Sequence, residues 1–148
     1  MPNFSNNKKR INLIEIALNE YGNREIAGAK HNSDVVKYFQ ETGFKQVKDD
    51  ETAWCSAFVN WVAMKSDCVY SKKLNAKSWL DVGIKTDKPQ LMDVCIFHRG
   101  DVKSWQGHVA FFIKETVNGV YVLGGNQMNQ VKIEYYPKNK LIEIRDIT

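Results

Sequence analysis

Residues 107–124 read GHVAFFIKETVNGVYVLG, and this stretch decides the fold class. Two runs rich in β-branched and aromatic residues, VAFFI and VYVL, stand on either side of the dipeptide Asn118-Gly119. Asn-Gly is the pair that a two-residue loop of type I′ favours, because both central positions of that turn need a positive φ. The stretch therefore predicts two antiparallel strands joined by a tight turn.

Short runs of the same kind stand before and after this hairpin. Together they cover residues 93–98, 107–115, 120–124, 131–136 and 141–147. Runs of this composition, bounded by turn residues, are typical of strands. We therefore expect an antiparallel sheet of about five strands in the C-terminal half of the chain.

The N-terminal half has the period of helices instead. An apolar stripe with helical spacing predicts a first helix that stops at Gly22. Ser33 and Thr52 are suited to cap a second and a third helix, and a further helical turn is expected around Trp79. Residues 1–10, which are polar and basic, are expected to be a flexible tail. Helices followed by antiparallel strands predict an α+β domain with the helices packed on the sheet.

Length and composition indicate one domain over residues 1–148. The chain is 43% hydrophobic and 26% charged, which is close to an average globular protein. Its net charge is +4, but the basic residues are scattered, so a nucleic-acid partner is not expected. No apolar run approaches the ~18 residues that span a membrane, and no signal peptide is recognisable at the N-terminus.

The cysteines are Cys55, Cys68 and Cys95, an odd number at wide spacing, so a disulfide framework is not expected. Cys55 stands out because it falls third in the predicted helix that Thr52 caps. Unpaired N–H groups and the positive end of the helix favour a thiolate there, which lowers the pKa below its usual value of ~8.5. The same N–H groups can hold an oxyanion. The alternative interpretation is a buried structural thiol.

A nucleophilic thiol needs a base, and the chain offers His31, His98 and His108. His31 lies in a polar stretch between helices, and His98 closes a strand. His108 is better placed, because Gly107 lets another segment approach closely and the following apolar strand holds the imidazole rigidly. His108 is therefore the candidate base.

The residue that orients His108 should come from the next strand, in the stretch GGNQMN. A strict two-residue loop favours Gln127 or Asn129 by register. A bulge at the two glycines would instead bring Asn126 onto the face of the histidine. The pattern leaves these alternatives open.

No metal and no cofactor are expected. Cys95 and His98 have the spacing of half a zinc site, but on a strand they face opposite sides, and no second half follows. There is also no glycine-rich phosphate motif. Trp54 and Trp105 lie near the candidate catalytic residues, so they are candidates for substrate binding, and Gln127 is a third.

The order of these residues resembles that of a known family. The segments TAWCSAFVNWV, AKSWLDVG, DVCIFHRGDVKSWQGHVAFFI and YVLGGNQMNQVKI are similar to papain-like peptidoglycan hydrolases of the NlpC/P60 and CHAP group. The resemblance covers most of residues 11–146 and rests on the motifs W-C-S, G-H-V-A and L-G-G-N-Q in this order. It implies a papain-like fold with Cys55 as nucleophile, His108 as base and Asn126 as the orienting residue.

The resemblance also implies an activity. The expected enzyme cuts amide bonds in the peptide part of bacterial peptidoglycan, as an endopeptidase or N-acetylmuramoyl-L-alanine amidase, and serves as a lysin or an antibacterial effector. Its partner is peptidoglycan, with an immunity protein or delivery machinery as further partners. We expect it to be made in the cytoplasm and to act on the cell wall, in the periplasm or outside the cell, after non-standard export or lysis.

Two other functions fit the same residues. One is a cysteine protease or deamidase that acts on a protein, because fold and triad do not set the substrate. The other is an inactive wall-binding module of the same fold.

Overall fold

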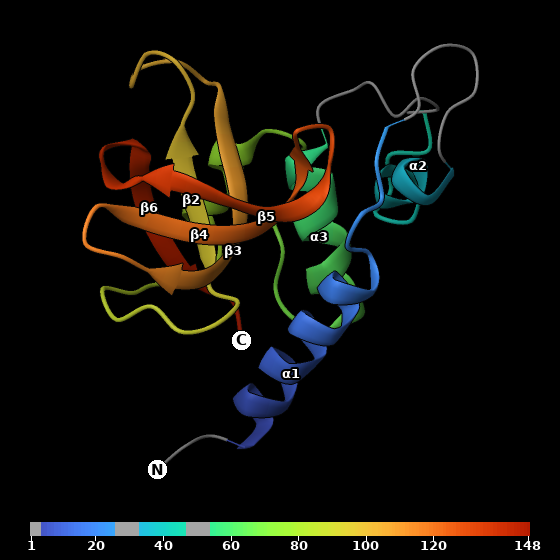
Figure 1. Cartoon of the computed structure of the whole chain (residues 1–148). Helices are drawn as coiled ribbons and strands as arrows, with labels where there is room; N and C mark the ends of the chain where they lie inside the picture. Colours follow the sequence, from blue (N-terminus) through green and yellow to red (C-terminus); the bar gives the residue numbers. More distant parts are fainter. Residues whose placement is uncertain (1–3, 26–32, 47–53) are drawn as a thin grey trace.

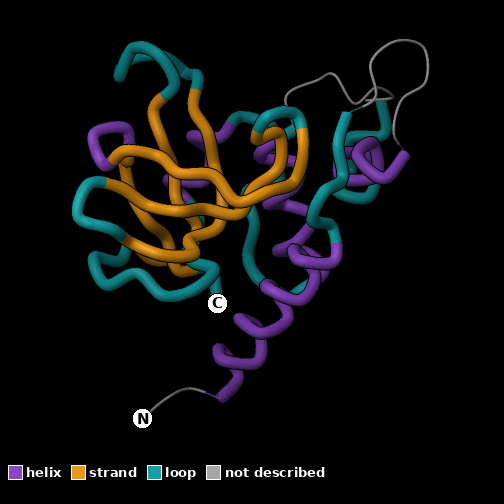
Figure 2. The backbone as a smooth tube through the Cα atoms, viewed as in Figure 1, coloured by secondary structure: helices purple, strands orange, loops and turns teal. Residues whose placement is uncertain are grey.

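The computed structural model describes residues 4–25, 33–46 and 54–148. Helices come first along the chain and a sheet follows, as predicted (Figures 1 and 2). The helical segments are α1 (Phe4–Asn19), α2 (Ser33–Gln40), α3 (Cys55–Lys65) and the 3-10 turns η1 (Ala76–Asp81) and η2 (Lys138–Lys140). The strands are β1 (Ile84–Lys85), β2 (Val94–His98), β3 (Gly107–Glu115), β4 (Gly119–Gln127), β5 (Gln130–Pro137) and β6 (Leu141–Asp146).

The six strands form one antiparallel sheet in the order β1-β6-β2-β3-β4-β5. The expected α+β class is confirmed, and each of the predicted strands is present. The short strand β1 was not predicted, because a two-residue strand has no period of its own. It exists only by pairing with the end of β6, where Ile84 faces Asp146.

The turn between β3 and β4 differs from the prediction. The Thr116 N–H donates to the Gly119 carbonyl oxygen at 2.8 Å, so the loop residues are Val117 and Asn118. Neither Asn118 nor Gly119 has a positive φ, so the predicted type I′ turn is wrong. Gly119 is needed for space instead, because a Cβ atom there would lie 2.5 Å from the carbonyl oxygen of Tyr136.

The turn with two positive φ angles lies in the next hairpin. Met128 and Asn129, with φ of 52° and 62°, connect β4 to β5. Just before this turn, the register between β4 and β5 shifts between Gly124 and Gln127. The bulge that the two glycines predict is therefore present, and it changes which side chain reaches His108.

Helix α3 is the centre of the main core. All residues from Cys55 to Ala63 are buried. The helix packs on β3 and β4 with one side and on α1 and α2 with the other. A helix that is apolar all round is stable only in such an interior position.

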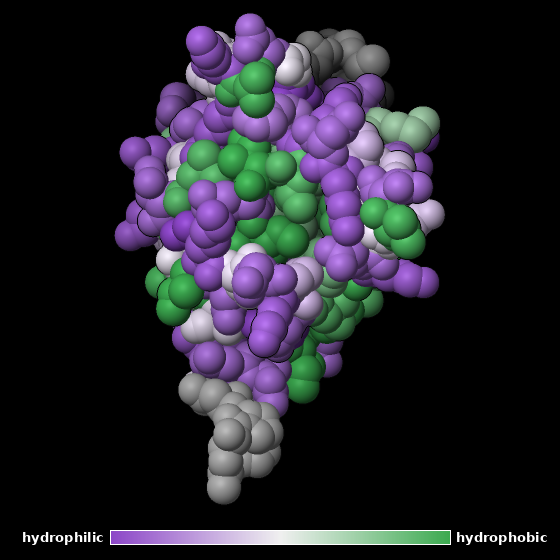
Figure 3. All heavy atoms as spheres, turned by 90° about the vertical axis from the view of Figure 1, so that its left-hand side faces the viewer, coloured by the Kyte–Doolittle hydropathy of each residue, from purple (hydrophilic) through white to green (hydrophobic). Residues whose placement is uncertain are grey.

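A second, smaller core lies on the other face of the sheet. Side chains alternate between the two faces along a strand, so Val94 and Ile96 join the main core while Cys95 and Phe97 join the smaller one. The side of the molecule that carries β6 and the strand ends is mainly hydrophilic, with hydrophobic side chains gathered near its middle (Figure 3). In the described ranges, no helix is long and apolar enough to cross a membrane.

The start of the chain is more ordered than predicted. Residues 1–10 are not a flexible tail throughout, because α1 already begins at Phe4. The reason is a pair of ion pairs from α1 to the sheet region: Arg10 lies 2.7 Å from Asp93 and 3.2 Å from Asp146. These contacts hold the first turns of α1 against the rest of the protein.

Candidate active site

Cys55 is the first residue of α3 and follows Trp54. The prediction that Cys55 is the third helical residue is therefore wrong. The expected cap, Thr52, lies outside the described residues. The first helical hydrogen bond runs from the Phe58 N–H to the Trp54 carbonyl oxygen, at 3.0 Å. The N–H groups of the first turn are thus unused by the helix, and those of Cys55 and Ser56 face the thiol.

Trp54 anchors the start of α3. Its side chain is fully buried, and its indole N–H donates to Glu25 Oε1 at 2.6 Å. Its ring also stacks on Tyr38, with 5.8 Å between the ring centroids. The prediction that Trp54 binds substrate is wrong, because a side chain enclosed in the core has no surface to offer.

Gly125 lets β4 pack directly against the start of α3. A Cβ atom at this position would lie 2.7 Å from Phe58 Cβ and equally close to the Trp54 ring. Any larger residue would therefore push the first turn of α3 away from the sheet. The bulged end of β4 and the helix start that carries Cys55 are held together by this close approach.

His108 is the second residue of β3 and is buried. Its Nε2 lies 2.9 Å from Gln127 Oε1. The Gln127 amide nitrogen donates to the carbonyl oxygens of Lys132, at 2.6 Å, and Val122, at 3.3 Å. Because the amide nitrogen is used there, the amide oxygen must face His108 and can only accept. His108 therefore carries its proton on Nε2, and Nδ1 has a free lone pair.

The orienting contact thus comes from Gln127, although the resemblance assigns it to Asn126. The bulge leaves Asn126 in the left-handed region, with φ of 57°, and places the next side chain on the histidine. Gln127 is 2% exposed and engaged with His108, and its predicted role in binding substrate stays a prediction. Asn129, the other candidate, lies in the turn.

Aromatic rings enclose the imidazole. Tyr136 of β5 stacks on His108 with 5.1 Å between centroids and an angle of 17°. Phe97 of β2 stacks in turn on Tyr136, at 4.6 Å. Burial among these rings lowers the pKa of His108 to about 4, while the hydrogen bond with Gln127 acts in the opposite direction. His108 is therefore a neutral base at neutral pH.

Burial also raises the pKa of the Cys55 thiol. The backbone of Val109, the charge of Arg99 and the N–H groups of the helix start act in the other direction. The predicted effect of the helix start is therefore present, but the cost of desolvating a thiolate is larger. Burial thus disfavours the charged form of both the thiol and the imidazole.

Two residues next to His108 interact electrostatically with Cys55. The backbone of Val109, the neighbour of His108, acts to lower the pKa of Cys55, and the charge of a Cys55 thiolate acts to raise the pKa of Tyr136, whose ring stacks on the imidazole. Nδ1 of His108 is buried and has no hydrogen-bond partner in the described chain. Catalytic hydrogen bonds are often long before substrate binds. Nδ1 is therefore the nitrogen of His108 with an available lone pair, and its predicted role as the base for Cys55 stays a prediction.

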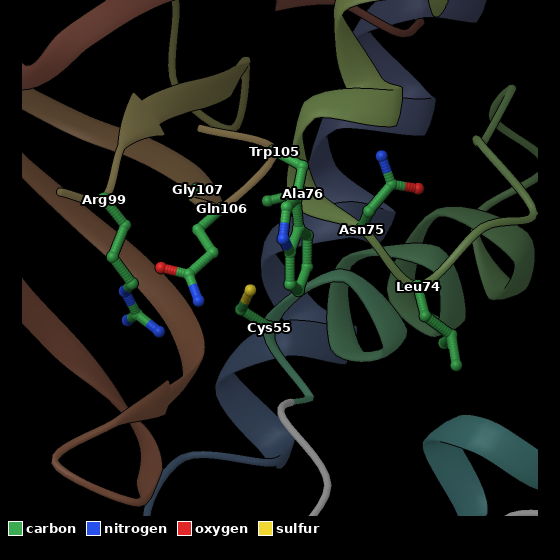
Figure 4. Close-up of a pocket in the computed structure, with 8 residues that line it drawn as sticks. All are labelled: Cys55, Leu74, Asn75, Ala76, Arg99, Trp105, Gln106 and Gly107. Atoms are coloured by element: carbon green, nitrogen blue, oxygen red, sulfur yellow. The ribbon is translucent and has the colours of Figure 1, made fainter. Parts of the chain in front are cut away.

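A pocket of about 120 Å³ opens beside Cys55 (Figure 4). It is lined by Cys55, Leu74, Asn75, Ala76, Arg99, Trp105, Gln106 and Gly107. Trp105 lies near Cys55, as predicted, and its role in binding substrate stays a prediction. Gly107 permits the close approach that was expected of it, because a Cβ atom there would lie 2.7 Å from the Phe97 carbonyl oxygen.

Polar contacts hold both walls of this pocket. On one side, Ser56 and Asn60 of α3 donate to the Lys73 carbonyl oxygen at 2.7 and 2.9 Å, just before the wall residue Leu74. On the other side, the Lys77 ammonium donates to carbonyl oxygens of the 99–106 loop, including that of Val102 at 3.2 Å. The pocket is thus built on α3 and η1.

The remaining histidines are not part of this arrangement. His98 ends β2 and pairs with Gly107 along the backbone, and the structure assigns it no function. His31 lies outside the described residues. Tyr136 and Arg99 were not predicted from the sequence. One feature of the sequence could have indicated a functional role for Arg99: it is a cation that lies directly between a strand end and a glycine.

Comparison with protein families matches residues 47–126, more than half of the chain, to the CHAP domain. No curated protein matches the chain. A solved structure of a Staphylococcus aureus protein, described as similar to lipoprotein of the NLP/P60 family, superposes with a TM-score of 0.53 at 19% identity. The match covers 95% of this chain and 42% of that protein, so the chain spans less than half of its length. The likeness confirms the papain-like α+β fold.

Proposed function

The chain belongs to the CHAP domain family, and on this premise we propose that it is a cysteine hydrolase that cleaves amide bonds in the peptide part of bacterial peptidoglycan. CHAP domains are generally cysteine peptidases or amidases of the peptidoglycan-hydrolase type. The observation that carries the proposal is the hydrogen bond of 2.9 Å between His108 Nε2 and Gln127 Oε1. It leaves the lone pair of the imidazole on Nδ1, the nitrogen that we assign to the proton of the Cys55 thiol.

In the proposed first step, Cys55 Sγ attacks the carbonyl carbon of the amide while its proton passes to His108 Nδ1. The N–H groups at the start of α3 stabilise the oxyanion that forms. His108 then gives the proton to the leaving nitrogen as the C–N bond breaks, which leaves a thioester on Cys55. Water, deprotonated by His108, hydrolyses the thioester and restores the thiol.

Gln127 has a positioning role in this proposal. It holds the Nε2–H of His108 and so keeps the lone pair on Nδ1 throughout the cycle. It also accepts a stronger hydrogen bond when the imidazole becomes charged, without adding a charge to the resting site.

We further propose that the enzyme acts as a lysin or an antibacterial effector, either as an endopeptidase or as an N-acetylmuramoyl-L-alanine amidase. The net charge of +4 supports attraction to an anionic cell wall. The two bond types leave different new termini, so the products identify the bond.

The test is digestion of isolated peptidoglycan from several bacteria, with mass spectrometry of the soluble fragments. Wild type is compared with Cys55→Ala and with Cys68→Ala, which removes a thiol that is equally exposed, at 6%, but lies just beyond the other end of α3. We expect fragments from wild type and Cys68→Ala and none from Cys55→Ala. Absence of fragments with folded wild type would contradict the proposal and favour a protein substrate or a binding module.

A further inference from the structure

Of the described residues that line the pocket beside Cys55, Arg99 is the only charged one. Within the part of the chain that the structure describes, no carboxylate forms an ion pair with it. The nearest acidic residue in sequence, Asp101, is turned into its own loop, where its Oδ1 accepts the Lys103 N–H at 3.0 Å. Among the described residues, the pocket therefore presents a cation that no carboxylate pairs with.

This cation acts on the reacting groups. Its charge contributes to lowering the pKa values of Cys55, His108 and Tyr136. In Figure 4, Arg99 and Gln106 lie on one side of the Cys55 sulfur, and Trp105 and Asn75 lie on the other. The guanidinium group and the thiol therefore border the same pocket.

The rest of the lining suits a peptide. Asn75 and Gln106 carry amide groups that can both donate to and accept from peptide bonds. Trp105 is 73% exposed, so its ring offers an apolar surface to a ligand. Ala76 and Gly107 are small and leave the pocket open next to these groups.

We propose that this pocket is a subsite for a peptide segment that carries a free carboxylate next to the amide that Cys55 attacks, with Arg99 as the specificity-determining residue. A guanidinium group binds a carboxylate through two parallel hydrogen bonds, which gives both affinity and orientation. The uncharged amide of the same peptide would leave the cation unpaired. The inference rests on the proposed function and names its substrate class.

The test uses two synthetic peptides, L-Ala-γ-D-Glu-L-Lys with a free α-carboxylate on the glutamate and the same peptide with a carboxamide there. Their binding to Cys55→Ala is measured by calorimetry, so that no turnover interferes. We expect the carboxylate peptide to bind at least about tenfold more tightly than the carboxamide peptide, because hydrogen bonds between two charged groups are stronger than those with a neutral partner. Adding Arg99→Gln to Cys55→Ala should remove this difference in affinity between the two peptides, and adding Arg99→Lys should retain part of it.

Lys103→Gln is the matched control, because it removes an exposed cation from the same loop without touching the pocket. It should leave the preference unchanged. Equal binding of the two peptides, no binding of either, or a preference that survives Arg99→Gln would overturn the inference. A carboxylate preference without any digestion of peptidoglycan would instead refute the proposed function and leave the subsite standing.

Discussion

At the scale of single residues, the imidazole of His108 is held by a neutral amide. Gln127 accepts the Nε2–H, and its own amide is fixed by the carbonyl oxygens of Val122 and Lys132. A carboxylate in this place would add a buried negative charge and favour a protonated imidazole. The amide fixes the tautomer while His108 stays neutral, which is what a base requires.

Gln127→Ala should reduce kcat/KM about 100-fold, because His108 loses the contact that fixes its tautomer and orientation. Asn126→Gly is the control, since glycine tolerates the φ of 57° at that position. It should change kcat/KM by less than about threefold. Steady-state kinetics on cell-wall fragments measures both variants. A larger loss in Asn126→Gly would return the orienting role to Asn126.

Gln127→Glu should move the acidic limb of the rate profile to higher pH. In the wild type, His108 with a pKa of about 4 remains a base down to that pH. A glutamate carboxylate would favour the imidazolium and raise the pKa of His108 by about 1 to 3 units. The base is then lost earlier as the pH falls. A pH profile of kcat/KM measures the shift, and an unchanged acidic limb would show that position 127 does not act through His108.

At the scale of elements, the site depends on the contact between the bulged end of β4 and the start of α3. The bulge turns Gln127 toward His108, and Gly125 lets the helix start lie against the strand. Cys55 lies on α3, Gln127 on β4 and His108 on the neighbouring strand β3. Their relative position is therefore set by strand and helix packing and not by a flexible loop.

Gly125→Ala should lower both stability and activity. The new Cβ atom would lie 2.7 Å from Phe58 Cβ and the Trp54 ring, so the helix start must shift. Overpacking of this kind costs about 1 to 3 kcal/mol, and the shift of Cys55 should reduce kcat about 100-fold. Urea unfolding and kinetics measure the two effects.

Gly43→Ala is the control that separates a loss of stability from a loss of activity. Its φ of 101° is unfavourable for alanine, but a Cβ atom there meets nothing within 4 Å. This variant should lose stability and keep the kcat of the folded protein. Full activity in Gly125→Ala would show that the close packing does not position Cys55.

The elements that the sequence predicted are those whose signal is local. The strand runs around VAFFI and VYVL and the helix with Cys55 have their own composition and period, and the double glycine correctly indicates a bulge. The residue types at Asn118-Gly119 led to a wrong turn prediction. Gly119 is required because a Cβ atom would not fit there, and the positive φ angles lie at Met128 and Asn129 instead.

The parts of the site that could not be predicted depend on packing between distant segments. Tyr136 reaches His108 only because β5, β4 and β3 are neighbours in the sheet. Trp54 is enclosed because Glu25 and Tyr38, far away in the sequence, cover it. A bulge shifts side chains by one residue, and its effect at Gln127 follows only from three-dimensional geometry.

At the scale of the whole molecule, burying a neutral histidine couples folding to pH. The pKa of His108 is 6.5 in its ordinary state and about 4 in the folded protein. The unfolded chain therefore binds the proton more tightly between these values. The contribution of neutral His108 to the free energy of unfolding is complete above pH 6.5 and is lost as the pH falls toward about 4.

The free energy of unfolding should accordingly fall by about 3 kcal/mol more in the wild type than in His108→Gln over this pH range. His108→Gln has no group that titrates at this position, so the difference between the two curves isolates His108 from the other acids. Urea unfolding at several pH values gives both curves. Parallel curves would show that His108 does not titrate with a lowered pKa.

The central claim is that Cys55 is activated by His108, and alkylation by iodoacetamide at neutral pH tests it most directly. Cys55 and Cys68 are each 6% exposed, and burial raises the pKa of both thiols, of Cys68 to about 11. Exposure therefore does not distinguish them. Peptide mass spectrometry follows each cysteine separately in wild type and in His108→Gln.

We predict that Cys55 reacts at least about tenfold faster than Cys68 in the wild type, because His108 accepts the thiol proton as the sulfur is alkylated. This advantage should disappear in His108→Gln while the rate at Cys68 stays the same. Equal rates at Cys55 and Cys68 in the wild type, or an advantage of Cys55 that survives in His108→Gln, would contradict the account.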